Sequence, residues 1–159
     1  MKKIICTVLS LVFLFSLVAC GGEIAEEVKP ENENKEPVYY EGHGIKMEIP
    51  AVWQDTFTPY YKEFGEGATA FELREFMTVI NGDEAGVLTV ASFNNESWKT
   101  ALAATPEGEK MKIGTSKDGN KHFTIRFEET KFKNEEDQKK FDQIVAAAKK
   151  CCENIEITE

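Results

Sequence analysis

An apolar run near the start of this chain limits what the rest of it can fold into. Residues 4–19 carry no charge and are mostly apolar, Lys2 and Lys3 precede them, and Gly21-Gly22 follow. This order of positive start, apolar stretch and small residues is typical of a secretory signal peptide. A transmembrane helix needs roughly 17–25 apolar residues, and these sixteen end in glycine and acidic residues. The pattern favours a signal peptide; an uncleaved anchor and ordinary secretion are the alternatives.

The end of the run carries a more specific motif. Leu17-Val18-Ala19-Cys20 stands directly before the two glycines and resembles the lipobox of bacterial lipoproteins. The resemblance implies that signal peptidase II removes residues 1–19 and that Cys20 carries a diacylglyceryl thioether with fatty acids such as palmitate. It places the protein at the cell membrane, lipid-anchored on the extracytoplasmic face. Cys6 would leave with the signal peptide.

The charge of the remaining chain excludes one class of partner. The chain has 19 Lys and Arg against 28 Asp and Glu, and two lysines leave with the signal, so the mature formal charge is −11. Such a surface disfavours nucleic acid and is repelled by anionic lipid headgroups. Solubility is the plain interpretation of this charge, and capture of a cationic partner is the functional one.

Residues 20–37 form the next segment. From Gly21 to Pro37 the chain is rich in Glu, Asn, Pro and Gly and has no aromatic residue, so it buries too little surface to offset its ordering entropy. We expect a lipidated, flexible, acidic tether. It separates the membrane from one α+β domain over residues 38–159.

Periodicity in that domain predicts strands and two helices. Residues 45–49, 71–79, 86–93, 111–113 and 123–127 are expected as strands, with 86–93 the most central and buried on both faces. A helix over residues 70–77 is the alternative to the second of these strands. Residues 54–67 are expected to be irregular. Asn95 or Ser97 is expected to cap a short helix, and Asn134 a longer one. The longer helix has an apolar stripe, which consists of Phe141, Ile144, Val145 and Ala148.

The segment from Gly44 to Trp53 reads GIKMEIPAVW and resembles the strand, proline, two residues and tryptophan that open PsbP-type domains. The apolar strand, acidic cap, amphipathic helix and short last strand at the end of the chain fit the same pattern. The resemblance implies an antiparallel sheet flanked by helices, a PsbP-like α/β/α sandwich. It implies little about function, because such domains serve many roles.

Few residues of the domain suggest chemistry. Cys151 and Cys152 extend the helix stripe and are expected to be two buried thiols under the sheet; a vicinal disulfide and a metal or redox role are the alternatives. His43 and His122 are expected at the surface. No Gly-x-Ser-x-Gly motif is present, although a Ser/His/Asp triad could assemble from distant residues. No cofactor or metal site is expected.

An aromatic group remains, which consists of Trp53, Phe57, Tyr60, Tyr61 and Phe64. Packing is its plain interpretation. In the functional alternative Trp53, Tyr60 and Tyr61 bind a protein, peptide or glycan partner, because Trp and Tyr favour such sites. The chain is therefore expected to be a non-enzymatic binding or accessory domain. A cell-surface hydrolase or thiol-redox enzyme is the alternative.

Overall fold

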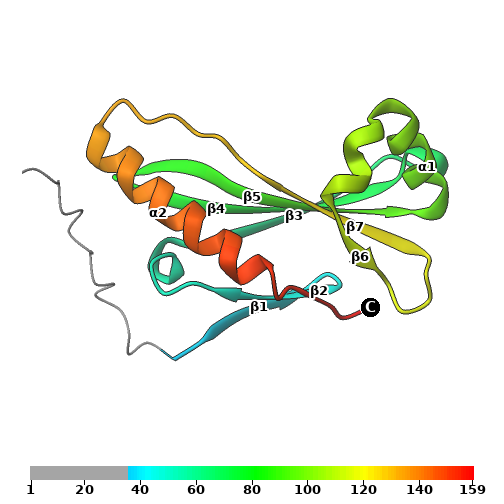
Figure 1. The fold of residues 1–159 in the computed structure, drawn as a ribbon, viewed down its shortest axis with the longest axis horizontal. Helices are drawn as coiled ribbons and strands as arrows, with labels where there is room; N and C mark the ends of the chain where they lie inside the picture. Colours follow the sequence, from blue (N-terminus) through cyan, green and yellow to red (C-terminus); the bar gives the residue numbers. More distant parts are fainter. Residues whose placement is uncertain (1–35) are drawn as a thin grey trace, which may run out of the picture. The chain divides into compact units, whose positions relative to one another are not determined.

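The computed structural model describes residues 36–159, which belong to a compact unit spanning Asn32–Glu159. Cys20 and the other residues before Glu36 lie outside the described residues. Between residues 36 and 159 the fold is α+β, and its strands form two antiparallel sheets (Figure 1). A single antiparallel sheet was expected, so the strand division differs from the prediction.

The smaller sheet has the order β1-β2-β8 and the larger one the order β3-β4-β5-β7-β6. The strands are β1 (Val38–Gly42), β2 (Ile45–Ile49), β3 (Thr58–Phe64), β4 (Phe71–Ile80), β5 (Asp83–Asn94), β6 (Lys112–Thr115), β7 (Lys121–Phe127) and β8 (Glu156–Ile157). The helices are α1 (Asn95–Ala104) and α2 (Glu135–Cys152), with short 3₁₀ turns η1 (Gln54–Thr56), η2 (Gly67–Thr69) and η3 (Pro106–Met111).

Strand β3 was not anticipated, because residues 54–67 were expected to be irregular. It is the edge strand of the larger sheet and pairs only with β4. An edge strand tolerates Pro59, whose missing N–H faces away from the sheet, and it needs no clean apolar alternation. Its residues are mostly exposed, so the pattern that reveals a strand was weak here.

Strand β5 lies in the middle of the five-stranded sheet, as predicted. The prediction that this strand is buried on both faces is only partly confirmed. Val87, Leu88 and Val90 are buried, whereas Thr89 and Ala91 are half-buried. The two faces of this sheet differ in what covers them. We call the face that carries Arg74 and Phe76 the inner face and the opposite one the outer face.

Helix α2 packs against β2, β4 and β5 (Figure 1). Its predicted stripe is confirmed, since Phe141, Ile144 and Ala148 are buried in the main core. Its predicted cap is also confirmed, because the N–H of Glu136 donates to Oδ1 of Asn134 at 2.8 Å. The core therefore lies between the inner face, α2 and the smaller sheet.

Helix α1 packs against one end of β5 and β7. Its cap is Asn94, not Asn95 or Ser97, and Oδ1 of Asn94 accepts the N–H groups of Glu96 at 2.9 Å and Ser97 at 2.8 Å. Trp98 is buried and lies 5.2 Å, centroid to centroid, from the ring of His122. Because His122 lies on the outer face, α1 covers that face at one end only.

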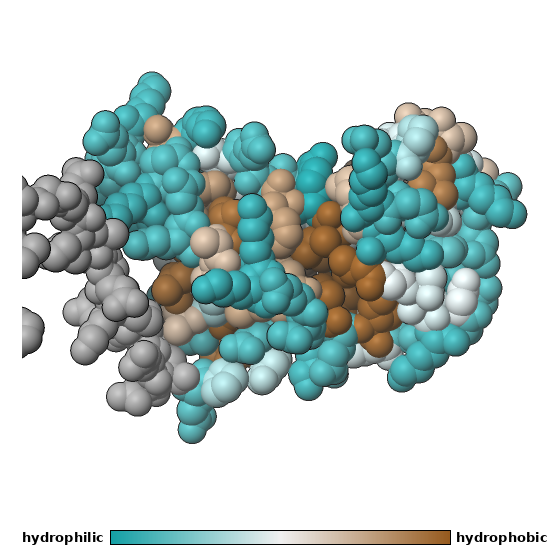
Figure 2. Space-filling view, in the orientation of Figure 1, coloured by the Kyte–Doolittle hydropathy of each residue, from teal (hydrophilic) through white to brown (hydrophobic). Residues whose placement is uncertain are grey.

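Figure 2 shows apolar side chains over β6 and β7, between α2 and the α1 end of the unit. The half-buried Ile113, Ile125 and Phe127 of these strands pack against the core from its margin. The charged side of α2 lies beside this area.

Candidate functional site

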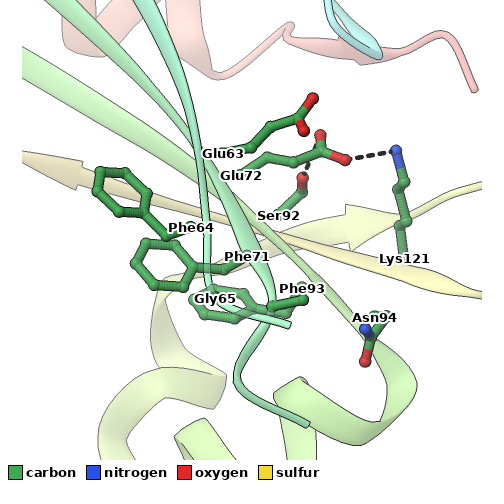
Figure 3. A pocket seen from close by; sticks show the side chains of 10 residues that line it. Glu63, Phe64, Gly65, Phe71, Glu72, Ser92, Phe93, Asn94 and Lys121 are labelled. Carbon is green, nitrogen blue, oxygen red and sulfur yellow. Dashed lines mark hydrogen bonds and ion pairs between the residues drawn. The ribbon is translucent and has the colours of Figure 1, made fainter. Parts of the chain in front are cut away.

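A pocket of about 280 Å³ lies at the end of the larger sheet, and we call it the corner pocket. Its lining residues are Glu63, Phe64, Gly65, Ala70, Phe71, Glu72, Ser92, Phe93, Asn94 and Lys121. Glu63, Glu72 and Ser92 stand directly opposite one another on β3, β4 and β5, so their side chains share the inner face. Gly65 and Ala70 supply almost no side chain to the lining, which leaves room for the hollow. Figure 3 shows the labelled lining residues from close by.

Arg74 lies beneath the pocket and is fully buried, with no exposed surface. Its Nε donates to the backbone oxygen of His43 at 2.7 Å, and its two terminal nitrogens donate to Ser92 Oγ at 3.0 Å and to Glu72 Oε2 at 2.6 Å. Its guanidinium also lies 5.5 Å from the ring centroid of Phe123. One side chain thus joins the β1–β2 turn to the centre of the larger sheet.

Glu72 is the carboxylate on which these bonds converge. It accepts from Arg74, from Ser92 Oγ at 3.0 Å and from Lys121 Nζ at 2.9 Å (Figure 3). Burial by itself would raise the pKa of Glu72, but the bonds from Lys121, Arg74 and Ser92 outweigh it and lower that pKa. The stabilisation is present above the unfolded pKa and is lost as pH falls through the lower folded pKa.

Lys121 is shared between two carboxylates. Its Nζ also lies 2.8 Å from Glu159 Oε2. Burial works against its charge, but the bonds from Glu159 and Glu72 prevail and raise the pKa of Lys121. The ammonium group is therefore charged at neutral pH and does not serve as a base.

Glu63 differs from Glu72 because, among the described residues, it has no cationic partner. Its Oε1 accepts the hydroxyl of Tyr61 at 2.8 Å. The Tyr61 ring is stacked on His43, with 3.6 Å between centroids. Burial, followed by the bond to Glu63, raises the pKa of Tyr61 to about 12, so the hydroxyl remains a donor. Tyr61 orients the carboxylate and leaves its second oxygen open.

The outer face beside the pocket carries a row of rings. Phe64, Phe71, Phe93 and His122 stand opposite one another on four adjacent strands. Phe64 lies 4.9 Å from Phe71, which lies 5.8 Å from Phe93, centroid to centroid. The row ends at Phe64, which is 39% exposed. It stiffens the sheet end that forms the pocket floor.

The two histidines occupy different surroundings. His43 is exposed, as predicted, in a tight turn at φ +48°. His122 was expected at the surface but is half-buried under Trp98. Burial and then the charge of Lys112 lower its pKa. Asn95 uses its amide nitrogen on Asn120, so His122 Nε2 donates to Asn95 Oδ1 at 2.7 Å. Its Nδ1 is buried and has no hydrogen-bond partner among residues 36–159.

The structure does not bring together the three aromatic residues predicted to bind a ligand. Trp53 is fully buried, and its Nε1 donates to the backbone oxygen of Met77 at 3.1 Å. Tyr60 is 41% exposed on the outer face, where its hydroxyl donates to Glu84. Tyr61 lies on the inner face. Of the three, only Tyr61 contacts a residue of the corner pocket.

Cys151 and Cys152 are free thiols, so the vicinal disulfide is not formed. Cys152 is 9% exposed and lies against β2, with its Sγ 3.5 Å from Met47 Sδ. Cys151 is only half-buried, so the expectation that both pack under the sheet is wrong for it. Burial raises the pKa of Cys152 to about 12 and also raises that of Cys151.

We expect Cys152→Ala to lower the free energy of unfolding by about 1–2 kcal/mol, because it removes a buried sulfur. Cys151→Ala is the matched control and should cost less. A thiol reagent should label Cys152 slowly in the native protein and quickly after denaturation. Rapid labelling of native Cys152 would contradict this packing and favour thiol chemistry.

Two serine hydroxyl groups, those of Ser92 and Ser116, form hydrogen bonds to carboxylates within the fold. Ser92 Oγ accepts from the Arg74 guanidinium and donates to Glu72, whose lowered pKa makes it a weak base for that hydroxyl. Ser116 Oγ donates to Asp118 inside the β6–β7 turn. Within residues 36–159, no three His, Cys, Asp or Glu side chains are grouped so that they could hold a metal ion.

Sequence reasoning missed the charged residues of the site. A carboxylate and an arginine two residues apart in a strand share a face, and here Glu72 and Arg74 share the face of buried Phe76. That spacing was the available signal for a buried ion pair. Lys121 and Glu63 reach the site only through strand pairing.

Comparison of the chain with protein-family models, curated proteins and solved structures finds no match. Among the helices of residues 36–159, none is both long and apolar enough to cross a membrane.

Proposed function

We propose that this chain is an extracytoplasmic lipoprotein, held at the membrane by a lipid on Cys20, whose domain binds a small ligand without transforming it. The observation that supports binding is the corner pocket. Its walls are fixed by mutual hydrogen bonds of Arg74, Glu72, Ser92 and Lys121. Rigid polar groups around a small hollow suit recognition, since little entropy is lost when they meet a ligand.

The chemistry of the same groups favours binding over catalysis. Lys121 is a charged donor, and Ser92 lies between a carboxylate and a guanidinium. Covalent catalysis requires a nucleophile with an effective base, and the bonds from Lys121 and Arg74 lower the pKa of Glu72 and make it a weak base for Ser92. The pocket offers hydrogen-bond donors, acceptors and charge. Those are the components of a binding site.

The proposed location is supported by the sequence. Lys2-Lys3, the apolar run and Leu17-Val18-Ala19-Cys20 follow the order of a lipoprotein signal. Residues 20–37 would then act as a flexible tether between membrane and domain. We also propose a PsbP-like domain, supported by the GIKMEIPAVW segment and by helices on both faces of the larger sheet.

Site-specific photocrosslinking on intact cells tests the binding role. A benzophenone amino acid replaces Phe64, which lines the pocket and is partly exposed. The control position is Lys139, which is exposed on α2. We expect an adduct of defined mass at position 64 that is absent at position 139. No adduct at position 64, or the same adduct at both positions, would count against binding at the pocket.

A further inference from the structure

We propose that the corner pocket recognises a small primary ammonium group that carries a neutral hydrogen-bond acceptor a few bonds away, with Glu63 as the anchor. This inference rests on the proposed binding function and names the chemistry of its ligand. It comes from the charge balance of the pocket, the orientation of Glu63 and the size of the hollow.

The charge balance leaves one negative charge uncompensated. Three carboxylates, those of Glu63, Glu72 and Glu159, meet two cations, Arg74 and Lys121. Arg74 and Lys121 both bind Glu72, and Lys121 also binds Glu159. Glu63, an exposed residue at the edge of the pocket, is the charged lining residue that lacks an opposite charge within residues 36–159. A ligand cation supplies the missing charge, and a ligand anion would add to the excess.

The orientation of Glu63 suits an ammonium group. The Tyr61 hydroxyl donates to one carboxylate oxygen of Glu63 at 2.8 Å. The raised pKa of Tyr61 keeps that hydroxyl protonated near neutral pH. A carboxylate oxygen accepts more than one hydrogen bond, so both oxygens can take N–H donors. Tyr61 itself is stacked on His43, which fixes the position of the pair before a ligand arrives.

Lys121 determines the second recognition element. Two carboxylates already share its charge, at 2.9 Å and 2.8 Å. An ammonium group has three donors, and these two contacts use two of them. The third suits a neutral acceptor such as an amide carbonyl, because a further carboxylate would compete with Glu72 and Glu159.

The size of the hollow limits the ligand. Pockets for drug-sized ligands span roughly 300–1,000 Å³, and the volume of the corner pocket, about 280 Å³, lies just below that range. Gly65 cannot be enlarged easily, since its φ is +67° and a Cβ there would clash with the backbone oxygen of Thr69. The pocket fits a molecule of the size of one amino-acid amide.

Glycinamide is the probe that tests this chemistry. The full chain, labelled with ¹⁵N and held in detergent micelles, is titrated at about pH 6.5, below the amine pKa of about 8. We expect shifts of the backbone amides of Glu63, Gly65 and Asn94. Glu63→Gln should weaken the apparent affinity about tenfold, as the loss of a charge-assisted hydrogen bond predicts. Glu129→Gln, at an exposed position that forms no ion pair with the described part of the chain, should leave the affinity unchanged.

N-acetylglycinamide keeps the carbonyl of glycinamide and adds a second one, but it removes the charge, so we expect it not to bind. Equal binding of both compounds, unchanged affinity in Glu63→Gln, or no shift with glycinamide would overturn the ammonium assignment. The spectrum of β7 shows whether Glu63→Gln is folded. A photocrosslink at position 64 together with failure of glycinamide would reject the ligand chemistry alone. Failure of both would reject the binding function itself.

Discussion

Replacement of Trp53 by alanine is expected to lower the free energy of unfolding by about 4 kcal/mol, within the roughly 3–5 kcal/mol of buried Trp or Phe truncations. Trp53 is fully buried and packs edge-on against Phe57, with 5.0 Å between centroids. Truncation leaves a cavity and frees the backbone oxygen of Met77 from its 3.1 Å bond. Denaturant unfolding monitored by circular dichroism measures the loss.

Two further variants make this result specific. Trp53→Phe keeps most of the volume but removes the N–H donor, so its loss should be intermediate. Val52→Ala changes the neighbouring residue, which is 42% exposed, and should cost less than about 1 kcal/mol. If Trp53→Ala cost as little as Val52→Ala, Trp53 would not be the core residue described here.

Arg74→Met is expected to lower the free energy of unfolding by about 3 kcal/mol. The change keeps an apolar stem but removes the cation from a fully buried position. Glu72 and Ser92 then lose their hydrogen bonds from Arg74. Removal of one member of a buried ion pair typically costs about 3–5 kcal/mol. Lys121 still neutralises Glu72 at 2.9 Å, which places the expected value at the lower end.

Arg126→Met is the matched control. Arg126 also pairs with a glutamate, Glu128, but the Arg126 side chain is 64% exposed. It should cost less than about 1 kcal/mol. The acid dependence gives a second readout. The wild type loses the stabilisation from Glu72 as pH falls through its lowered folded pKa, and Arg74→Met should lose less. If Arg74→Met changed neither the free energy of unfolding nor its dependence on acid pH, Arg74 would not stabilise the fold through Glu72.

Local patterns predicted the elements with strong periodicity. The stripe of α2 repeats along one helix face, and its Asn134 cap needs only neighbouring residues. The position of β5 followed from its apolar run. In each case the determining interactions are short in sequence, so composition and spacing were enough.

The buried face of β4 does not follow from the number of its apolar residues. Phe71, Leu73 and Met77 share one parity along the strand, yet they are half-buried, whereas Arg74 and Phe76 on the other parity are fully buried. A charged residue is rarely placed in a core by sequence alone, because its burial depends on partners elsewhere. Those partners include the backbone of His43 and the side chain of Ser92.

The corner pocket could not be predicted for the same reason. Glu63, Glu72 and Lys121 lie on three strands, and only the sheet register brings them together. The predicted group of Trp53, Tyr60 and Tyr61 relied on closeness in sequence. Alternation along β3 sends Tyr60 and Tyr61 to opposite faces, and packing buries Trp53.

Lipidation of Cys20 is the claim on which the proposed location depends. Metabolic labelling of bacteria that express the full chain with a tagged fatty acid measures it directly. We expect label on the wild-type protein in the membrane fraction and none on Cys20→Ala, while Cys151→Ala keeps the label. Label that persists on Cys20→Ala, or a wild-type protein that never acquires it, would contradict a lipid anchor at Cys20.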